Sequence, residues 1–352
     1  MNISPLLKLM VEKKASDLFF TTTAPVKIKM EGKQHAVGKA DLDADTVKAA
    51  AYGIMTPEQI QFFESNMEVD FAIAEEGVGR FRVNVFRQRG NVAMVLRYIP
   101  SVIPELESLN VPEVLKDLIL SKRGLLLMVG ATGSGKSTTL AAMINHRNKN
   151  STGHILTIED PVEFTHPNHG CIVNQREVGV DTHSYHNALK SSLREAPDVI
   201  LIGEIRDRET MEAAMELAGT GHLAISTLHA NNAFQAMDRV INMFPQDLHK
   251  QLFMDLSLNL RGVVSQRLVL GKDGKRTAAV EVLINTPHIA ELILKGKIDD
   301  LKQAMAESNE KGMQTFDSAL FHLYKAGRVE LEEALKNADS RTNLEALINF
   351  GG

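Results

Sequence analysis

The feature that most constrains the fold of this chain is the glycine-rich stretch GATGSGKS at residues 130–137. It follows the apolar run LLLMV (125–129) and leads into TTLAAM, which has the composition of a helix. A strand that turns through glycines into a helix points backbone N–H groups and the positive end of the helix dipole at one place, which suits bound phosphate. The pattern G-x-x-x-x-G-K-[ST] therefore predicts a P-loop that binds a nucleotide.

The loop residues have separable expected roles. Lys136 is expected to reach the β- and γ-phosphates of ATP, and the Ser137 hydroxyl to bind Mg²⁺. The remaining expected phosphate-binding positions are Gly130, Ala131, Thr132, Gly133, Ser134, Gly135 and Thr138. A P-loop alone does not show whether the protein is a kinase, a nucleotide-dependent switch, a nucleic-acid translocase or a motor that moves other proteins.

The apolar runs around this motif predict a parallel sheet flanked by helices. The runs LLLMV, HILTI (154–158), DVILIG (198–203) and HLAISTL (222–228) are short and nearly continuous, as expected of strands buried on both faces. Beyond residue 231 the sequence predicts mainly helix, including residues 247–269, with a hairpin that turns at Asp273–Gly274. The last sixty or so residues, from about 287, are predicted to form a helical tail.

The first hundred residues predict a small α+β domain. Helical stretches alternate with strands at 17–21, 26–37 (turning at Glu31–Gly32), 68–75, 79–86 and 91–99. Thr56 followed by Pro57 predicts a helix start. A proline-containing stretch then predicts a linker, so the expected organisation is a domain at 1–99, a linker at 100–111 and a second domain at 112–352.

Acidic residues follow two of the predicted buried strands. Glu204 ends the strand 198–203, where P-loop proteins need an acid beside Mg²⁺. Glu159, Asp160 and Glu163 follow the strand 154–158, and one of them can deprotonate the attacking water. The alternative for all four is a solvated strand end or turn; for Glu204 the P-loop favours the functional interpretation.

Two histidines and a basic strand are further candidates. His229 follows the strand 222–228 at the end where parallel sheets bind ligands, so it is a candidate γ-phosphate contact, whereas His222 is expected to be structural. Arg80, Arg82 and Asn84 share one face of their strand, and Arg97 on the next strand can join them. Such arginines can stabilise the charge that develops during phosphoryl transfer, or form a solvated face.

Composition narrows the classes of partner. The net charge of −5 and the absence of Trp argue against a nucleic-acid translocase, which needs a basic surface and stacking aromatics. The single cysteine, Cys171, excludes an intramolecular disulfide and a four-cysteine zinc site, and fits a reducing compartment. No run of about 18 apolar residues occurs, so no direct membrane insertion is expected.

Four blocks together carry a family resemblance: GATGSGKSTT, TIEDPVEF, LREAPDVILIGEIRD and AGTGHLAISTLHANNA. In this order and spacing they resemble the secretion ATPases of type II/IV secretion and type IV pili, over residues 1 to about 340. The resemblance is nearest to the pilus retraction ATPases, the PilT/PilU group. It implies an α/β fold with a small PAS-like α+β N-terminal domain, a RecA-like ATPase domain and a helical C-terminal region.

The resemblance also implies roles and partners. Lys136 and Glu204 correspond to the Walker A lysine and Walker B acid, Glu163 to the candidate catalytic base beside Glu159, and His229 to the His box; Arg82 and Arg97 lie in the region that supplies arginines to nucleotide sites. The implied cofactors are ATP and Mg²⁺. The implied partners are a homohexamer, a sister retraction ATPase and an inner-membrane pilus platform protein, which places the chain in the cytoplasm, peripheral at the inner membrane.

Two sequence features narrow the choice within the family. The single cysteine excludes the four-cysteine motif of pilus-extension and type II secretion relatives, which favours the retraction ATPases; the C-terminal sequence favours the PilU branch among them. PilT-type members carry a stretch close to AIRNLIRE, whereas the corresponding HIAELILKGK (288–297) lacks its arginines. The expected function is an ATP-hydrolysing motor for pilus retraction and twitching motility, as an accessory ATPase. The alternative is an ATP-binding regulatory or scaffold subunit with little turnover of its own.

Overall fold

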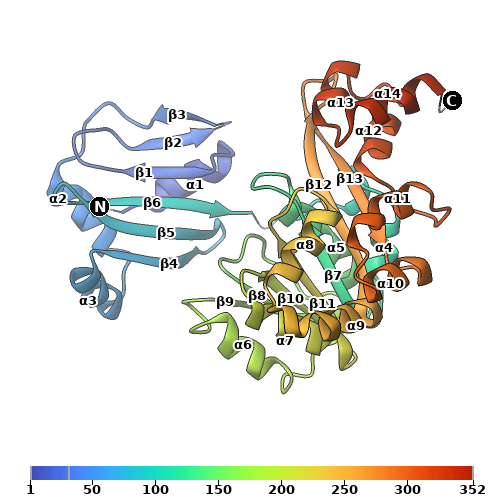
Figure 1. The fold of residues 1–352 in the computed structure, drawn as a ribbon. Helices are drawn as coiled ribbons and strands as arrows, with labels where there is room; N and C mark the ends of the chain where they lie inside the picture. The colour runs from blue at the N-terminus through green and yellow to red at the C-terminus, as the bar shows by residue number, and fades with distance from the viewer. Residues whose placement is uncertain (1, 31, 101, 351–352) are drawn as a thin grey trace. The chain divides into compact units, whose positions relative to one another are not determined.

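The computed structural model describes residues 2–30, 32–100 and 102–350. The chain divides into two compact units (Figure 1). The N-terminal unit comprises residues 1–102, 162–165 and 179–181, and the C-terminal unit comprises residues 103–161, 166–178 and 182–352. The division after residue 102 falls inside the stretch 100–111 that the sequence marks as a linker.

The N-terminal unit is built on a six-stranded sheet in the order β3-β2-β1-β6-β5-β4, in which all neighbours are antiparallel. Its elements are α1 Ser4–Glu12, β1 Asp17–Phe20, β2 Lys27–Met30, β3 Lys33–Ala36, α2 Ala44–Tyr52, α3 Pro57–Asn66, β4 Glu68–Glu75, β5 Gly79–Gln88 and β6 Asn91–Ile99. The α+β prediction is therefore confirmed. Of the predicted turn at Glu31–Gly32, Glu31 lies outside the described residues, and Gly32 has a φ of 81°.

The two faces of β5 differ as the alternation predicts. Phe81, Val83 and Val85 are completely buried in a core with the three helices, while Arg80, Arg82 and Asn84 occupy the other face. The predicted start of α3 is also present, because Thr56 and Gln59 form a capping box ahead of Pro57. The helices thus cover one sheet face and leave the arginine-bearing face uncovered by them.

The C-terminal unit is built on a seven-stranded sheet in the order β13-β12-β7-β11-β10-β8-β9. Every neighbouring pair is parallel except the β12–β13 hairpin. The strands are β7 Gly124–Val129, β8 Gly153–Glu159, β9 Cys171–Glu177, β10 Val199–Glu204, β11 Leu223–Leu228, β12 Leu260–Leu270 and β13 Arg276–Ile284. The predicted parallel sheet is confirmed, as is the hairpin turn at Gly274, which has a φ of 75°.

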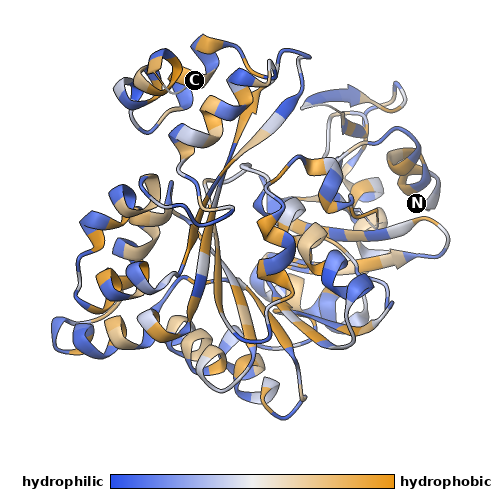
Figure 2. Ribbon diagram, turned by 90° about the vertical axis from the view of Figure 1, so that its right-hand side faces the viewer, coloured by the Kyte–Doolittle hydropathy of each residue, from blue (hydrophilic) through white to orange (hydrophobic). Residues whose placement is uncertain are grey.

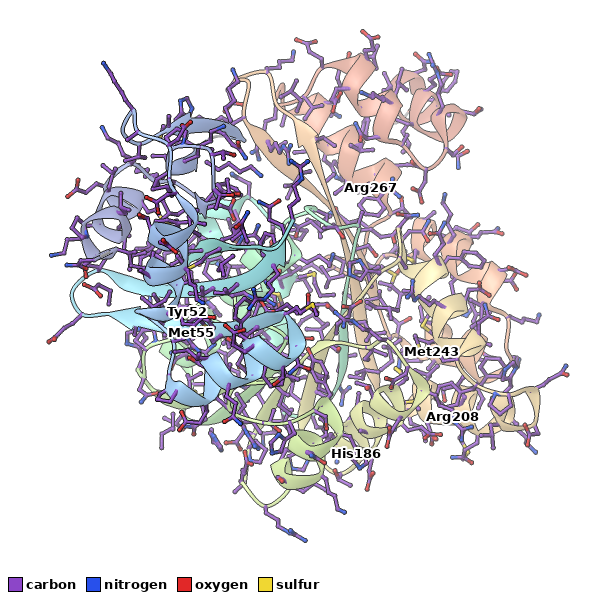
Figure 3. The ribbon with its side chains drawn as sticks, turned by 90° about the vertical axis from the view of Figure 1, so that its left-hand side faces the viewer. Tyr52, Met55, His186, Arg208, Met243 and Arg267 are labelled. Atoms are coloured by element: carbon purple, nitrogen blue, oxygen red, sulfur yellow. The ribbon has the colours of Figure 1, made fainter. Side chains whose placement is uncertain are left out.

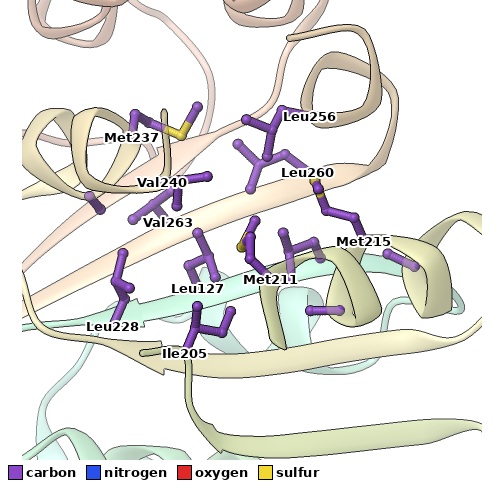
Figure 4. Packing of buried hydrophobic residues seen from close by; sticks show 14 of the residues in the cluster. Leu127, Ile205, Met211, Met215, Leu228, Met237, Val240, Leu256, Leu260 and Val263 are labelled. Carbon is purple, nitrogen blue, oxygen red and sulfur yellow. The ribbon is translucent and has the colours of Figure 1, made fainter. Parts of the chain in front are cut away.

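Helices pack on both faces of this sheet, and its strands are largely apolar with polar residues at intervals (Figure 2). The helices are α4 Val114–Ile119, α5 Lys136–Asn150, α6 Tyr185–Ser192, α7 Arg208–Gly219, α8 Ala233–Asn242 and α9 His249–Asn259. One face packs Leu127 and Leu228 against methionines and leucines of α7, α8 and α9 (Figure 4). This burial fixes where the strands end, and hence where the loops that follow them meet.

Two expectations for this unit were incomplete. The predicted helix over 247–269 ends at Asn259, and β12 begins at Leu260. A run of leucines and valines fits a helix and a buried strand equally well, and here β12 pairs in parallel with β7. The edge strand β9 was not predicted, because only its first three residues are apolar and its last four (NQRE) are polar.

The chain ends in a helical region, as predicted: α10 Pro287–Leu294, α11 Leu301–Ala306, α12 Phe316–Lys325, α13 Leu331–Asn337 and α14 Arg341–Phe350. The stretch 288–297, which distinguishes this chain from PilT-type sequences, includes most of α10. Ile289, Leu292 and Ile293 of this helix are buried in the core. Within the described parts of the chain, no helix combines the length and the apolarity needed to cross a bilayer.

Candidate nucleotide site

Four neighbouring parallel strands bring the predicted site residues to one edge of the C-terminal sheet. Val129 of β7 pairs with Leu228 of β11, so the phosphate loop and His229 follow at the same level. Thr227 pairs in turn with Glu204 of β10. Ile202 pairs with Ile158 of β8, which places Glu159 at this edge as well. The carboxyl ends of parallel strands are where α/β sheets bind ligands.

The phosphate loop lies between β7 and α5 as the sequence predicts. Gly133 and Gly135 have φ values of 78° and 86°, a left-handed conformation that glycine adopts without strain. Lys136 is the first residue of α5, and its Nζ donates hydrogen bonds to the carbonyl oxygens of Gly130 (2.6 Å) and Ala131 (2.9 Å). The lysine ammonium is therefore held inside the loop, with its side chain buried.

Glu204 lies in a charged cluster beside this loop. Its Oε1 lies 3.3 Å from Nε2 of His229, and its Oε2 accepts a 2.8 Å hydrogen bond from Nε of Arg206. The guanidinium of Arg206 also lies 3.8 Å from Asp160. The hydrogen bond to Glu204 raises the pKa of Arg206. Both carboxylate oxygens of Glu204 thus have a basic partner, and the sequence analysis had not identified Arg206.

Glu159 is held by two uncharged neighbours. Thr157 donates a 2.6 Å hydrogen bond to its Oε1, and Gln175 of β9 donates a 3.3 Å hydrogen bond to the same oxygen. Tyr185, at the start of α6, packs closely against the backbone of Gly203. A Cβ at Gly203 would lie only 2.6 Å from the Tyr185 hydroxyl. Burial, reinforced by the Asp160 carboxylate, raises the pKa of that hydroxyl. Thr157, Gln175 and Tyr185 were missed because only the tertiary fold brings them to the acids.

Two other predicted residues, Glu163 and His222, are not part of this cluster. Glu163 is exposed and lies on 162–165, which belongs to the N-terminal unit, so its role as the base stays a prediction. His222 precedes β11 and therefore lies at the opposite end of that strand from His229. Its Nδ1 lies 3.2 Å from the Leu217 carbonyl oxygen, consistent with the structural role expected for it. Of the two histidines, only His229 lies at the edge that carries the acids.

The arginines of the N-terminal unit differ in how firmly they are held. Arg97 pairs at 2.8 Å with Asp17, whose side chain is only 4% exposed. Arg82 lies directly opposite Arg97 in the sheet, but the carboxylate nearest to it is the exposed Asp70 at 3.9 Å. Arg97 is thus tied to a buried carboxylate, whereas Arg82 has a long and solvated ion pair.

A cavity of about 620 Å³ adjoins the phosphate loop. Gly135, Thr138 and Thr139 form its wall on the loop side, and the β12–β13 hairpin forms much of the remainder. Its other lining residues include Asn110, Leu268, Lys272, Arg276 and Arg328. This cavity could not be predicted from the sequence, because its walls come from four separate segments of the C-terminal unit: 108–110, 135–139, 266–278 and 327–328.

Comparison with known proteins identifies the family. The model for "Type II/IV secretion system protein" matches residues 2–344. The chain belongs to this secretion-protein family. It is 54% identical to "Type IV pilus ATPase PilU" of Pseudomonas aeruginosa, over 100% of this chain and 92% of that protein. It is 42% identical to "Type IV pilus retractation ATPase PilT" of the same organism, over 96% and 98% of the two chains.

A solved structure agrees with these relatives. The "Crystal Structure of the Pilus Retraction Motor PilT and Bound ADP" is 41% identical, has a TM-score of 0.92 and covers 98% of this chain and 99% of that one. This member of the secretion-protein family is an ATPase of the PilT/PilU group, and the identities confirm the predicted similarity to PilU. The predicted fold, a RecA-like ATPase domain with a smaller N-terminal domain and a helical C-terminal region, is confirmed.

Proposed function

We propose that the protein is an accessory, PilU-like motor that hydrolyses ATP at the edge of the C-terminal sheet to power type IV pilus retraction and twitching motility. The observation that carries this proposal is the placement of the Glu204 carboxylate, 3.3 Å from His229, at the same edge as the phosphate loop of Lys136. An acid, a histidine and a P-loop on neighbouring strands suit phosphoryl transfer to water.

Each residue in the cluster has a role in this proposal. The Lys136 ammonium moves from the Gly130 and Ala131 carbonyls to the β- and γ-phosphates of ATP, which the loop N–H groups also bind. Glu163 or Glu159 orients and deprotonates the attacking water. His229 donates a hydrogen bond to the γ-phosphate. Because His229 also lies 3.3 Å from Glu204, the position of Glu204 then depends on whether the γ-phosphate is present.

The oxygen donors at the loop fit Mg²⁺. Ser137 offers a hydroxyl and Glu204 a carboxylate, and Mg²⁺ prefers such hard oxygen ligands together with substrate phosphates. When bound, Mg²⁺ neutralises charge on the phosphate oxygens. Ser137 would hold it directly and Glu204 through water. We further propose that the 620 Å³ cavity takes the base and ribose, because its walls continue from Gly135 and Thr138 of the loop.

Arg82 is the residue we propose to act on a neighbouring subunit's nucleotide. Its long ion pair with the exposed Asp70 costs little to break, whereas moving Arg97 would take a cationic partner from the buried Asp17 and leave it the Ser16 hydroxyl at 2.8 Å. We expect Arg82→Ala to lower ATP turnover in the assembled protein by roughly 10-fold or more, with the melting temperature unchanged. Arg97→Ala, the matched variant, should lower the melting temperature instead. Unchanged turnover in Arg82→Ala would make this strand a solvated basic face.

The names of the relatives support the proposed setting. A homohexamer places Arg82 of one chain at the nucleotide of the next. A sister retraction ATPase is one proposed partner, because this chain resembles both PilU and PilT of one organism. An inner-membrane pilus platform protein is the other proposed partner, as the family resemblance implies. The proposed location is the cytoplasm, peripheral at the inner membrane through the pilus machine. Loss of γ-phosphate contacts after hydrolysis would release the closed arrangement and move the ring.

The stretch 288–297 favours one alternative, a scaffold that binds ATP but does not need to hydrolyse it. Glu204→Gln separates the two, because it removes the negative charge without changing side-chain size. We expect the purified variant to bind ATP but to lose at least about 100-fold in turnover. In a piliated cell that lacks the natural gene and keeps the sister ATPase, the motor proposal expects Glu204→Gln not to restore twitching. Full restoration by this variant would favour the scaffold, and wild type serves as the positive control.

A further inference from the structure

Gln266 is a buried polar side chain that lines the 620 Å³ cavity but has no role in the proposed catalytic steps. It lies on β12, outside the phosphate-loop motif, and is 2% exposed. Its Nε2 donates a 3.0 Å hydrogen bond to the carbonyl oxygen of Ser134, and its Oε1 accepts a 2.8 Å hydrogen bond from the Thr139 hydroxyl. Both partners flank Lys136, so one amide connects the loop to the first turns of α5.

The glycines at the two ends of the loop leave room for the same residue. A Cβ at Gly135 would lie 2.7 Å from Nε2 of Gln266, and a Cβ at Gly130 would lie 2.6 Å from the Gln266 carbonyl oxygen. Contacts this short do not occur for a real Cβ. Gly130 and Gly135 therefore allow the loop to close on Gln266 from both ends, in addition to supplying their φ values of 153° and 86°.

The register of the sheet explains why this strand can reach the loop. Ser265 of β12 pairs with Val129, the last residue of β7, so the next residue lies level with Gly130. The amide of Gln266 satisfies a donor and an acceptor that would otherwise be buried without partners. The N–H groups of the phosphate loop must point inwards to bind phosphate, so its carbonyl groups point outwards. The Gln266 amide gives the outward-pointing Ser134 carbonyl a hydrogen-bond donor and so fixes its direction.

We propose that Gln266 is a positioning residue that sets the shape of the phosphate loop and thereby the affinity for nucleotide. It acts through its hydrogen bonds to Ser134 and Thr139, and it is also one of the residues that line the 620 Å³ cavity. The inference rests on the proposed phosphate-binding role of residues 130–138. It adds a determinant of ATP affinity from a strand on the other side of the loop.

The test compares Gln266→Leu with wild type in the full chain. Leucine keeps most of the volume but makes neither hydrogen bond. We expect the Kd for a fluorescent ADP analogue and the KM for ATP to rise about 10- to 100-fold, since two buried bonds are lost. Without nucleotide, the melting temperature of Gln266→Leu should fall no further below wild type than that of the control variant, Gln314→Leu. Gln314 also donates from its amide to a backbone carbonyl, Val280 at 2.7 Å, away from the loop.

Two further variants keep the inference falsifiable. Gln266→Glu keeps the acceptor for Thr139 but loses the donor to Ser134, and it serves if Gln266→Leu does not fold. Thr139→Val removes the other bond, so combining it with Gln266→Leu should cost less than the sum of the two single changes. A nucleotide Kd in Gln266→Leu and Gln266→Glu within twofold of wild type would overturn the proposal. Failure of wild type itself to bind the ADP analogue would instead contradict the proposed site.

Discussion

Lys136→Ala should reduce ATP turnover by roughly 100- to 1,000-fold. The ammonium is enclosed by the carbonyl oxygens of Gly130 and Ala131, so it is the one full positive charge that the loop itself can present to phosphates. Without it, only backbone N–H groups and the dipole of α5 oppose the phosphate charge. Stabilisation by ADP should also disappear, because the shift in melting temperature depends on the ratio of ligand concentration to Kd.

Lys149→Ala is the matched control for this change, because Lys149 lies on the same helix and pairs with Glu105 in an exposed ion pair. Such pairs contribute little, so its turnover and melting temperature should equal those of wild type. The measurements are steady-state hydrolysis and thermal unfolding with and without ADP. Saturable hydrolysis in Lys136→Ala within tenfold of wild type would show that the nucleotide binds elsewhere.

Most of the fold could be predicted because its signals are local. Apolar runs such as VILI in β10 predict strands buried on both faces, and the Thr56–Pro57 pair predicts the start of α3. The boundary between α9 and β12 could not be predicted, because Leu260 continues an apolar pattern that suits both structures. Pairing with β7, a contact between residues more than 130 positions apart, decides the outcome.

The site was predictable only where a motif carries it. Lys136 and Glu204 stand in recognisable contexts after strands, and the structure brings them to one edge of the sheet. Tyr185 and Gln266 have no such context, because each acquires a role only through tertiary contacts. Arg206 lies only two residues after Glu204, but no motif role singles it out. Sequence reasoning therefore finds the residues proposed to meet the phosphates more readily than the residues that position them.

The same limit applies to a partly buried charge network between β12 and the C-terminal helices. Arg267 (Figure 3) pairs with Asp339 at 2.5 Å and donates to the carbonyl oxygens of Asn337 (2.8 Å) and Asn231 (3.1 Å). Its guanidinium also stacks 3.9 Å from the ring centre of Phe316. Asn231 follows His229 by two residues, so this arginine joins the tail helices to the loop beyond β11. Arg267 follows Gln266 directly, so adjacent residues of one strand reach the phosphate loop and the C-terminal helices.

Arg267→Ala should be the most destabilising of the changes considered, lowering the unfolding free energy by roughly 2–4 kcal/mol. The loss leaves the Asp339 carboxylate, 9% exposed, with Lys302 at 3.6 Å as its remaining cationic partner, and it uncovers Phe316. For a chain of 352 residues we expect a fall of about 3–5 °C in melting temperature. Arg267→Lys should recover part of the loss, because it keeps the charge but neither the forked hydrogen bonds nor the stacking.

Arg341→Ala is the matched control, because Arg341 pairs with Glu345 at 2.9 Å on the exposed face of α14. It removes an arginine and an ion pair of similar length from the same C-terminal region, and should change stability by less than about 0.5 kcal/mol. Thermal unfolding of the three variants and wild type, without nucleotide, gives the comparison. If Arg267→Ala and Arg341→Ala have the same melting temperature, the Arg267 network does not stabilise the C-terminal helices. If the melting temperature of Arg267→Ala is well below that of Arg341→Ala, the Arg267 guanidinium holds the C-terminal helices against the loop after His229. A structural change in that loop would then alter the packing of the helices, and the reverse would also hold.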